Sequence, residues 1–245
     1  MQQKQNKMGV MPIPRLLLSM AIPLMLSLLV QSLYNIVDSI YVARISEKAL
    51  TATSLAYPVQ ILMIALGVGT AVGINALLSR LLGQKNLEAV GKGAATGLVL
   101  SVLSSCLFIL TGLLFSDAIA RGMTDDAQTA EMCAVYLRVV TVFCTGSFLE
   151  TMVQRFLQAS GKTGLSMVSL IIGAGANIIL DPIFIFHFGM GVRGAAIATV
   201  IGQWLGALTA LILNAVYNPE VRVSFRGFRL EGGVIRDIYR VGLPT

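Results

Sequence analysis

The stretch LLLSMAIPLMLSLLVQSLYNIV at residues 16–37 decides the fold class, because it contains no charged side chain. An α-helix needs about 20 apolar residues to cross the roughly 30 Å hydrocarbon core of a bilayer. Lys4, Lys7 and Arg15 precede the stretch, as basic residues do in a secretory signal peptide. The run is longer than the roughly 7–15 apolar residues of such a peptide, and no small-residue cleavage site follows before Asn35. We therefore predict a retained membrane span.

Comparable apolar runs recur along the chain and predict six membrane spans. These cover residues 16–43, 51–78, 93–116, 132–157, 163–186 and 194–217. Backbone polar groups within hydrocarbon must be satisfied inside the segment, which favours helices over strands. Of the 245 residues, 56% are hydrophobic and 12% are charged, whereas soluble domains carry about 25% charged residues. We predict an all-α, polytopic membrane bundle; the composition excludes a cytosolic enzyme, a disordered chain and a secreted disulfide scaffold.

The basic residues gather on one side of the predicted bundle. If the N-terminus is cytoplasmic, thirteen of the 18 basic residues are cytoplasmic: Lys4, Lys7, Arg15, Arg80, Lys85, Lys92, Arg155, Lys162, Arg222, Arg226, Arg229, Arg236 and Arg240. Arg44, Lys48, Arg121 and Arg193 fall outside, and Arg138 falls within a span. Because this is the positive-inside bias, we predict a plasma-membrane protein with both ends of this segment in the cytoplasm. The formal net charge of +6 accordingly reflects topology, and we predict no nucleic-acid partner.

The two ends of the chain resemble each other. Residues 20–24 read MAIPL and open the first span, while residues 241–245 read VGLPT after a basic, amphipathic segment. We predict a six-helix lobe over residues 1–217, a cytoplasmic linker over 218–240 and the start of a truncated seventh span over 241–245. Many secondary transporters consist of two repeated bundles. We therefore expect this chain to be the first half of a roughly twelve-span protein, completed by a second lobe in the same chain or by a second copy.

Glycines and prolines are expected to shape the helices. Glycine pairs at four-residue spacing allow close helix approach and are Gly69/Gly73, Gly93/Gly97 and Gly202/Gly206. Pro23 and Pro182 each remove one backbone hydrogen bond and are expected to bend their helices. Pro182 is the more notable of the two, because it directly follows an acidic residue within a span.

Two aspartates lie inside predicted spans, where a charge costs about 2.5–3.5 kcal/mol on insertion scales. Asp38 lies six residues before Arg44 and Asp181 six before His187, which is a depth of roughly 9 Å below the outer helix ends at the helical rise. Thr199 lies at the same depth in the sixth span. Asn177 precedes Asp181 by one helical turn and therefore shares its helix face. The sequence thus predicts one polar layer in the outer half of the bundle.

Further polar residues border this layer. Tyr34 and Asn35 lie about one turn before Asp38, on its helix face. Arg138 is seven residues into the fourth span, from which it can reach either this layer as a counter-ion or the outer surface. Glu150 lies near the inner end of the same span, and we expect its side chain to snorkel to the cytoplasmic interface.

The predicted layer offers carboxylate, amide and hydroxyl oxygens. Such ligands suit a hard cation or a proton and do not form a zinc pattern. Two carboxylates in a low-dielectric cavity repel each other, so the pair can load and release a proton. We therefore predict a site for a proton or for sodium at Asp38, Asn177, Asp181 and Thr199. Apart from this coupling ion, we predict no cofactor, no catalytic residue and no enzymatic activity.

The sequence resembles the N-terminal half of a multidrug and toxin extrusion (MATE) transporter over essentially its whole length. The matching segments are AIPLMLSLLVQSLYNIVDSIYVARI at 21–45, SRLLG at 79–83, RFLQASGKT at 155–163, NIILDPIFIF at 177–186 and GVRGAAIAT at 191–199. The resemblance implies a twelve-helix protein of two six-helix lobes that exports organic cations in exchange for protons or sodium. It also implies that Asp38, Asn177, Asp181 and Thr199 form the cation site of the N-terminal lobe, and that Pro23 bends the first helix.

Three other functions are compatible with a membrane bundle. A flippase for lipid-linked precursors or polysaccharides, of a related fold, is the main alternative. It calls for a basic cavity, and apart from Arg155 at the cytoplasmic end of the fourth span, Arg138 is the arginine available within the predicted spans. An intramembrane aspartyl protease also needs two membrane aspartates, yet Asp38 and Asp181 lack a Gly-x-Gly-Asp context. A non-transporting scaffold would leave the polar layer unexplained. The favoured reading is an efflux antiporter with membrane lipid and small organic cations as its partners.

Overall fold

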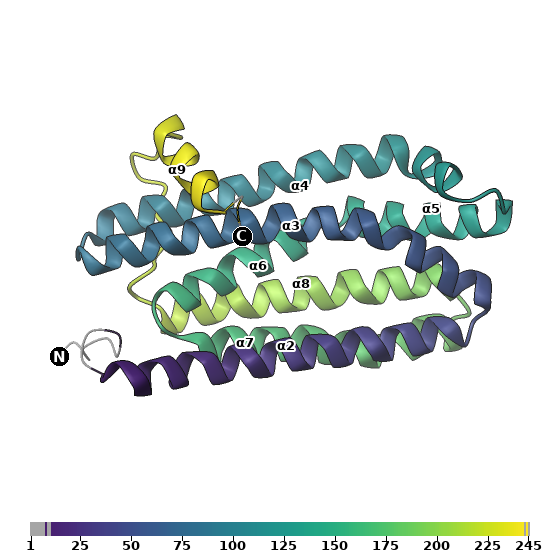
Figure 1. The fold of residues 1–245 in the computed structure, drawn as a ribbon, viewed down its shortest axis with the longest axis horizontal. Helices are drawn as coiled ribbons and strands as arrows, with labels where there is room; N and C mark the ends of the chain where they lie inside the picture. Colours follow the sequence, from purple (N-terminus) through teal and green to yellow (C-terminus); the bar gives the residue numbers. More distant parts are fainter. Residues whose placement is uncertain (1–7, 9–10, 243, 245) are drawn as a thin grey trace.

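The computed structural model describes residues 8, 11–242 and 244 of the chain. Lys4 and Lys7, which contribute to the charge bias, and Leu243 and Thr245, which belong to the expected seventh span, lie outside the described residues. Within the described residues the chain forms helices joined by short connections, with no strand among them (Figure 1). The all-α prediction is therefore confirmed.

The long helices run along one axis (Figure 1). They are α2 (Ile13–Ala43), α3 (Glu47–Gly83), α4 (Leu87–Met123), α7 (Thr163–Pro182), which continues into the π-helical turn η1 (Ile183–His187), and α8 (Gly191–Tyr217). By length and hydropathy these form five candidate membrane spans. The fourth predicted span is a bent pair, α5 (Ala127–Val142) and α6 (Thr145–Ala159), whose axes differ by 48°. Counted as one, the pair completes up to six spans among the described residues, so the protein is a multi-pass membrane bundle.

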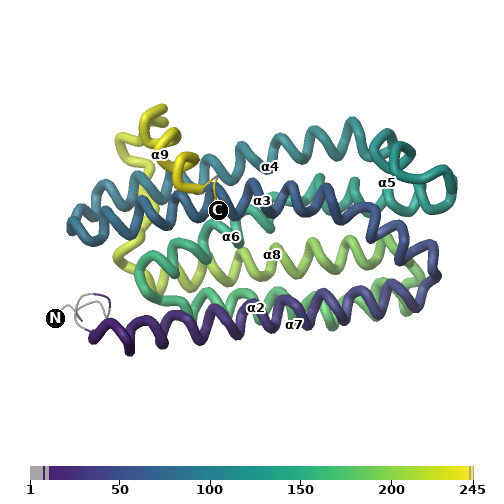
Figure 2. Tube along the Cα trace, in the orientation of Figure 1, coloured from purple at the N-terminus to yellow at the C-terminus, as the bar shows by residue number. Residues whose placement is uncertain are grey.

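The helices alternate in direction (Figure 2). The described start of α2 lies at the same end as the connections 84–86 and 160–162, and we call this the basic end. The connections 44–46, 124–126 and 188–190 lie at the opposite end, which we call the far end. Helices α2, α7 and α8 lie on one side of the bundle and α3, α4 and α5 on the other, with α6 between them.

The interior holds two hydrophobic clusters of described residues. One contains Leu137, Val140 and Phe148, and the other contains Met152 and Phe156, so both draw on the α5–α6 pair. On the outer surface, α2 leaves many large apolar side chains exposed: Leu17, Leu18, Ile22, Met25, Leu28, Leu29, Leu33 and Ile36. An apolar exterior around a packed interior is what a lipid environment requires.

The bend between α5 and α6 turns α6 into the bundle interior. Cys144 donates from Sγ to the Ser105 carbonyl oxygen at 3.6 Å, and Thr145 Oγ1 donates to Ser105 Oγ at 3.0 Å, which ties the break to α4. Beyond the break, Gly146 leaves room for Trp204 of α8, since a Cβ at Gly146 would lie 2.9 Å from the indole ring. These contacts fix the direction in which α6 leaves the bend.

Glycines permit the closest helix contacts, as predicted. A Cβ at Gly202 would lie 2.8 Å from the Gly173 carbonyl oxygen, so α7 and α8 meet almost backbone to backbone. Gly97 of α4 similarly faces Met152 of α6, with a Cβ placed 2.9 Å from the sulfur. The interpretation of these small residues as packing positions is confirmed.

A short helix, α9 (Gly232–Gly242), lies across α3 within the predicted linker (Figure 1). A Cβ at Gly73 would collide with the Ile238 carbonyl group, and one at Gly242 would collide with Gly69. The Gly69/Gly73 pair therefore receives α9 rather than another span. Val241 and Gly242, expected to begin a seventh span, are the last residues of α9.

At the far end, Asp126 caps α5 and joins it to α3. Its Oδ2 accepts from the backbone N–H of Thr129 at 3.0 Å and from the Thr129 hydroxyl, and its Oδ1 accepts from Lys48 Nζ at 3.0 Å. The hydrogen bond from the Thr129 hydroxyl, followed by the bond from Lys48, lowers the pKa of the Asp126 carboxyl to about 2.

We expect a carbon-13 NMR titration of the Asp126 carboxyl to give a midpoint near 2. Because the folded pKa lies below the ordinary value of 3.8, the capping interactions stabilise the fold above that value and are lost as the pH falls towards 2. Lys48→Met should raise the midpoint while Thr129 still holds it below the ordinary value. A midpoint near 3.8 in the unchanged protein would contradict the capping geometry.

Candidate functional site

The four residues predicted to hold a cation come together where α2, α7 and α8 meet. Asp181 is fully buried and Asn177 is 3% exposed. Asn177 Nδ2 lies 3.4 Å from Asp181 Oδ1 and 3.4 Å from Thr199 Oγ1. Turning the amide over puts its nitrogen 3.2 Å from Asp181 Oδ2 and lets its oxygen accept from the Thr199 backbone N–H at 3.2 Å. In either orientation, Asn177 links the α7 carboxylate to α8.

Asp38 completes this cluster from α2. Its carboxyl group lies within electrostatic range of the Asp181 carboxyl group, and two carboxylates this close repel each other unless a proton or a cation binds between them. Asp38 Oδ1 is buried and has no hydrogen-bond partner among the described residues. A buried polar atom without a partner is costly. A proton or a hard cation bound in the cluster would therefore give Asp38 Oδ1 a partner.

The donor set of the cluster narrows its chemistry. The described residues contain no group of three or more His, Cys, Asp or Glu side chains that could hold a metal ion. Two carboxylates with an amide and a hydroxyl supply oxygen ligands, which fit a proton or sodium rather than a transition metal.

The end of α7 places these side chains. Pro182 has no N–H to continue the α-helical bonding, and the chain passes into the π-turn of η1, which closes with the Phe188 N–H donating to the Ile183 carbonyl oxygen at 2.9 Å. Gly194 then lets α8 start close to η1, since a Cβ there would lie 2.8 Å from the Phe184 carbonyl. Pro182 thus marks a change of helix type, while Pro23 lies within the unbroken helix α2.

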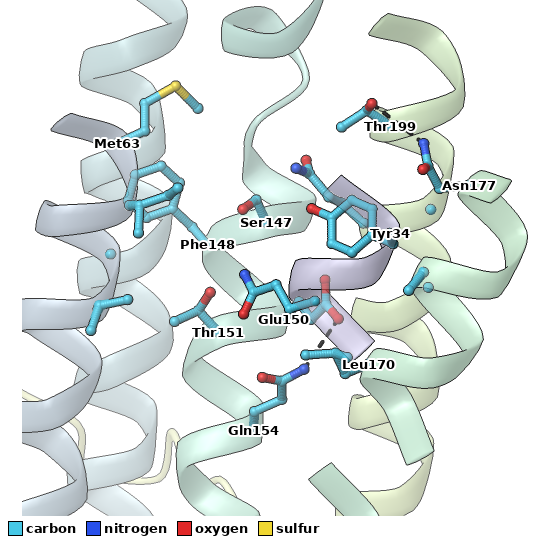
Figure 3. A pocket seen from close by; sticks show the side chains of 18 of the residues that line it. Tyr34, Met63, Ser147, Phe148, Glu150, Thr151, Gln154, Leu170, Asn177 and Thr199 are labelled. Carbon is cyan, nitrogen blue, oxygen red and sulfur yellow. Dashed lines mark hydrogen bonds between the residues drawn. The ribbon is translucent and has the colours of Figure 1, made fainter. Parts of the chain in front are cut away.

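A cavity of about 220 Å³ opens beside this cluster (Figure 3). Its lining comes from α2, α3, α6, α7 and α8 and includes Gln31, Tyr34, Met63, Phe148, Glu150, Gln154, Leu170, Asn177, Thr199 and Gln203. Asn177 and Thr199 belong both to the cluster and to the cavity wall, whereas Asp38 and Asp181 are not among the described lining residues. A molecule bound in the cavity would therefore contact Asn177 and Thr199 rather than the two aspartates themselves.

Glu150 corrects one prediction from the sequence. Its carboxylate does not snorkel to the interface: it lines the cavity and accepts from Gln154 Nε2 at 3.1 Å. A Cβ at Gly206 of α8 would collide with it, so α8 passes directly against this carboxylate. The bend of 48° between α5 and α6 sets the direction of the helix from which Glu150 projects into the cavity.

The three residues predicted to support the site, Tyr34, Asn35 and Arg138, lie in different places. Tyr34 lines the cavity and lies within electrostatic range of Asp38, Glu150 and Asp181. Asn35 is exposed on α2 and is not among the described lining residues. Arg138 pairs with Asp117 and is half-exposed, so of its two expected positions it takes the surface one and is not a counter-ion for the cluster.

The sequence interpretation missed the polar face of α6. Ser147, Thr151 and Gln154 line the cavity together with Glu150, at spacings of three, four and seven residues. That spacing is the signature of one helix face. A polar stripe inside an apolar span is the signal that could have identified this face of α6. The stripe is difficult to recognise when residues 132–157 are taken as one straight helix.

The fold and the site together define a polytopic helical membrane lobe with a carboxylate pair, one member of which is fully buried, beside a cavity. The sequence profile of the MatE family matches residues 23–183. The chain belongs to this family, whose characterised members are transporters rather than enzymes. Similar curated proteins include the multidrug export protein MepA of Staphylococcus aureus strain MRSA252, which is 27% identical over 235 residues, 96% of this chain and 52% of that protein. MepA of Staphylococcus haemolyticus is 25% identical over 226 residues, 92% of this chain and 50% of that protein.

Solved structures agree with this assignment. The outward-facing conformation of a multidrug resistance MATE family transporter matches 99% of this chain and 54% of its own, with a TM-score of 0.92 and 30% identity. A transporter of the MOP superfamily from Pyrococcus furiosus, described as having a binding pocket of reverse polarity, matches 99% of this chain and 54% of its own, with a TM-score of 0.91 and 30% identity. The chain spans about half the length of the curated relatives it matches.

Proposed function

We propose that this chain is the ion-coupled lobe of a secondary transporter that exports organic cations across the plasma membrane in exchange for protons or sodium. The observation that carries the proposal is the Asp38–Asp181 pair, in which Asp181 is fully buried and Asp38 Oδ1 has no partner among the described residues, joined through Asn177 to a cavity wall. Membership of a family that includes multidrug export proteins supports the same function.

Coupling in this proposal is a difference in binding between two conformations. A proton entering the cluster neutralises one carboxylate of the Asp38–Asp181 pair, and a sodium ion balances one of its two charges. Either event changes the hydrogen bonds that Asn177 makes to Asp181 and to α8. Those bonds link α7 to α8 in the cavity wall, so the ion favours one arrangement of that wall. The ion can drive export only as far as its affinities for the two arrangements differ.

A second lobe completes the proposed transporter, either in the same chain or as a second copy. The relatives' length supports this, because this chain matches about half of each. The excess of basic residues near the basic end supports a cytoplasmic position for that end. For the flippase alternative, the described lining residues include one basic side chain, Arg155, which is too few for a cavity that receives an anionic headgroup.

We expect cells that lack their own major efflux pumps to lose preloaded ethidium faster when they express this protein from its own gene. Discharging the proton gradient with a protonophore, or replacing external sodium by choline, should stop the added efflux, and the treatment that does so identifies the coupling ion. Ethidium loss at the rate of cells without the gene, or added efflux that survives both treatments, would contradict ion-coupled export.

A further inference from the structure

Glu150 lies in the cavity at a position formed by three helices. It projects from α6, and Gly206 of α8 and Gly173 of α7 pack against its carboxylate. A Cβ at Gly206 would collide with Glu150 Oε1, and one at Gly173 would lie 3.6 Å from it. Side chains larger than glycine at Gly206 would therefore displace the carboxylate. The close approach of α8 holds the charge at one defined place in the wall.

No cation is paired with this carboxylate among the described residues. Glu150 accepts a hydrogen bond from the neutral amide of Gln154. The ion pairs among the described residues do not include Glu150. Arg155, the basic residue among the described lining residues, donates from Nη1 to Gln158 Oε1 at 2.8 Å. Charged groups within a membrane bundle are normally paired or functional. A partner for Glu150 must therefore come from the cavity.

The surroundings of Glu150 fit a large, lipophilic partner. Met63, Phe148 and Leu170 supply apolar surface to the same cavity. In Figure 3 the ring of Tyr34 lies between Glu150 and the Asn177–Thr199 pair, and Tyr34 is within electrostatic range of both Glu150 and the two aspartates. An apolar wall with an aromatic ring and one anion is the combination that binds organic cations.

We propose that Glu150 is the counter-ion for a lipophilic organic cation bound in this cavity, and that it acts separately from the Asp38–Asp181 pair. The inference rests on the proposed function, since it identifies the residue that gives the cavity its preference for cationic cargo. It assigns two roles to two carboxylate positions: Asp38 and Asp181 bind the coupling ion, and Glu150 binds the cargo.

The test compares two probes of the same shape and opposite charge. Tetraphenylphosphonium and tetraphenylborate binding to the purified chain would be measured by equilibrium dialysis at pH 9, where carboxyl groups ionise. We expect Glu150→Gln to weaken phosphonium binding by at least about tenfold, the effect of losing about 1.4 kcal/mol. Borate binding should stay the same or tighten. Glu88→Gln, which neutralises an exposed glutamate paired with Lys92, is the matched control and should change neither.

A second pair of variants tests the position without removing the charge. Gly206→Ala should displace the Glu150 carboxylate and weaken phosphonium binding, whereas Gly175→Ala, with no atom within 4 Å of the added Cβ, should not. Phosphonium binding unchanged in both Glu150→Gln and Gly206→Ala would overturn this inference. If Asp181→Asn abolished ion-driven efflux in the same series, the proposed function would stand without it. Failure of the unchanged protein to bind phosphonium would overturn this inference, whereas the ethidium efflux measurement decides the proposed function.

Discussion

Asp181→Asn is expected to abolish ion-driven export, lowering the ion-dependent rate of ethidium efflux by about 100-fold, the upper range of coupling between two sites. The substitution replaces a carboxyl group by an amide of almost the same size at a fully buried position. The amide cannot take up a proton and supplies no negative charge to a cation. It can still bond to Asn177, so the packing of α7 against α8 should survive.

Asp117→Asn is the matched control for Asp181→Asn. Asp117 lies on α4 near the far end and pairs with Arg138, where both side chains are about half-exposed. The same change of charge there should leave efflux near its original rate. Thermal unfolding would verify that both variants fold. Undiminished efflux in Asp181→Asn, in a protein that unfolds at the original temperature, would show that the pair does not carry the coupling ion.

Gly112→Ala should destabilise the bundle strongly by adding a single methyl group. A Cβ at Gly112 of α4 would collide with the Thr141 hydroxyl of α5 and lie 2.7 Å from the Thr141 Cβ. Thr141 cannot swing away easily, because its hydroxyl donates to the Leu137 carbonyl oxygen at 2.6 Å in the same helix. Overpacking of this kind costs about 1–3 kcal/mol. Chemical unfolding of the detergent-solubilised chain measures the loss.

The control for this substitution lies ten residues further along α4. Gly122→Ala adds the same methyl group where no atom lies within 4 Å. Alanine in a helix is more stable than glycine by about 0.5–1 kcal/mol, so this variant should be slightly stabilised. The two glycine-to-alanine changes should therefore alter the free energy of unfolding in opposite directions. Equal effects at the two positions would mean that α4 and α5 are not packed at Gly112 as described.

Much of the fold could be predicted because a bilayer restricts the chain severely. Long uncharged runs such as residues 16–37 have to become helices, since hydrocarbon offers no partner for free backbone groups. The length of each uncharged run then indicates which residues of the predicted helix span the membrane. The four polar residues of the cluster were found by the same simple geometry, because depth along a helix and the four-residue repeat fixed their positions before any packing was known.

The parts that could not be predicted depend on contacts between distant segments. The inward course of α6 needs Ser105 of α4 and Trp204 of α8 to hold the bend. The sequence therefore predicts an interfacial position for Glu150, because the bend that changes this position is not evident from the sequence. Arg138 had two open positions, and Asp117 of the neighbouring helix decided between them. The docking of α9 on Gly69 and Gly73 was equally invisible, since glycine pairs do not reveal which helix they receive.

The sequence by itself determined a bundle of membrane helices and one polar layer, with Asp38, Asp181 and Thr199 at a common depth and Asn177 one turn away on the helix face of Asp181. Hydrophobic length and helical rise act within one segment, so they can be read from order along the chain. The tertiary structure alone decided that Asp38 lies beside Asp181, that a cavity opens next to Asn177 and Thr199, and that Glu150 faces it. These features depend on the rotation and tilt of each helix, which are set by side chains packing across the bundle.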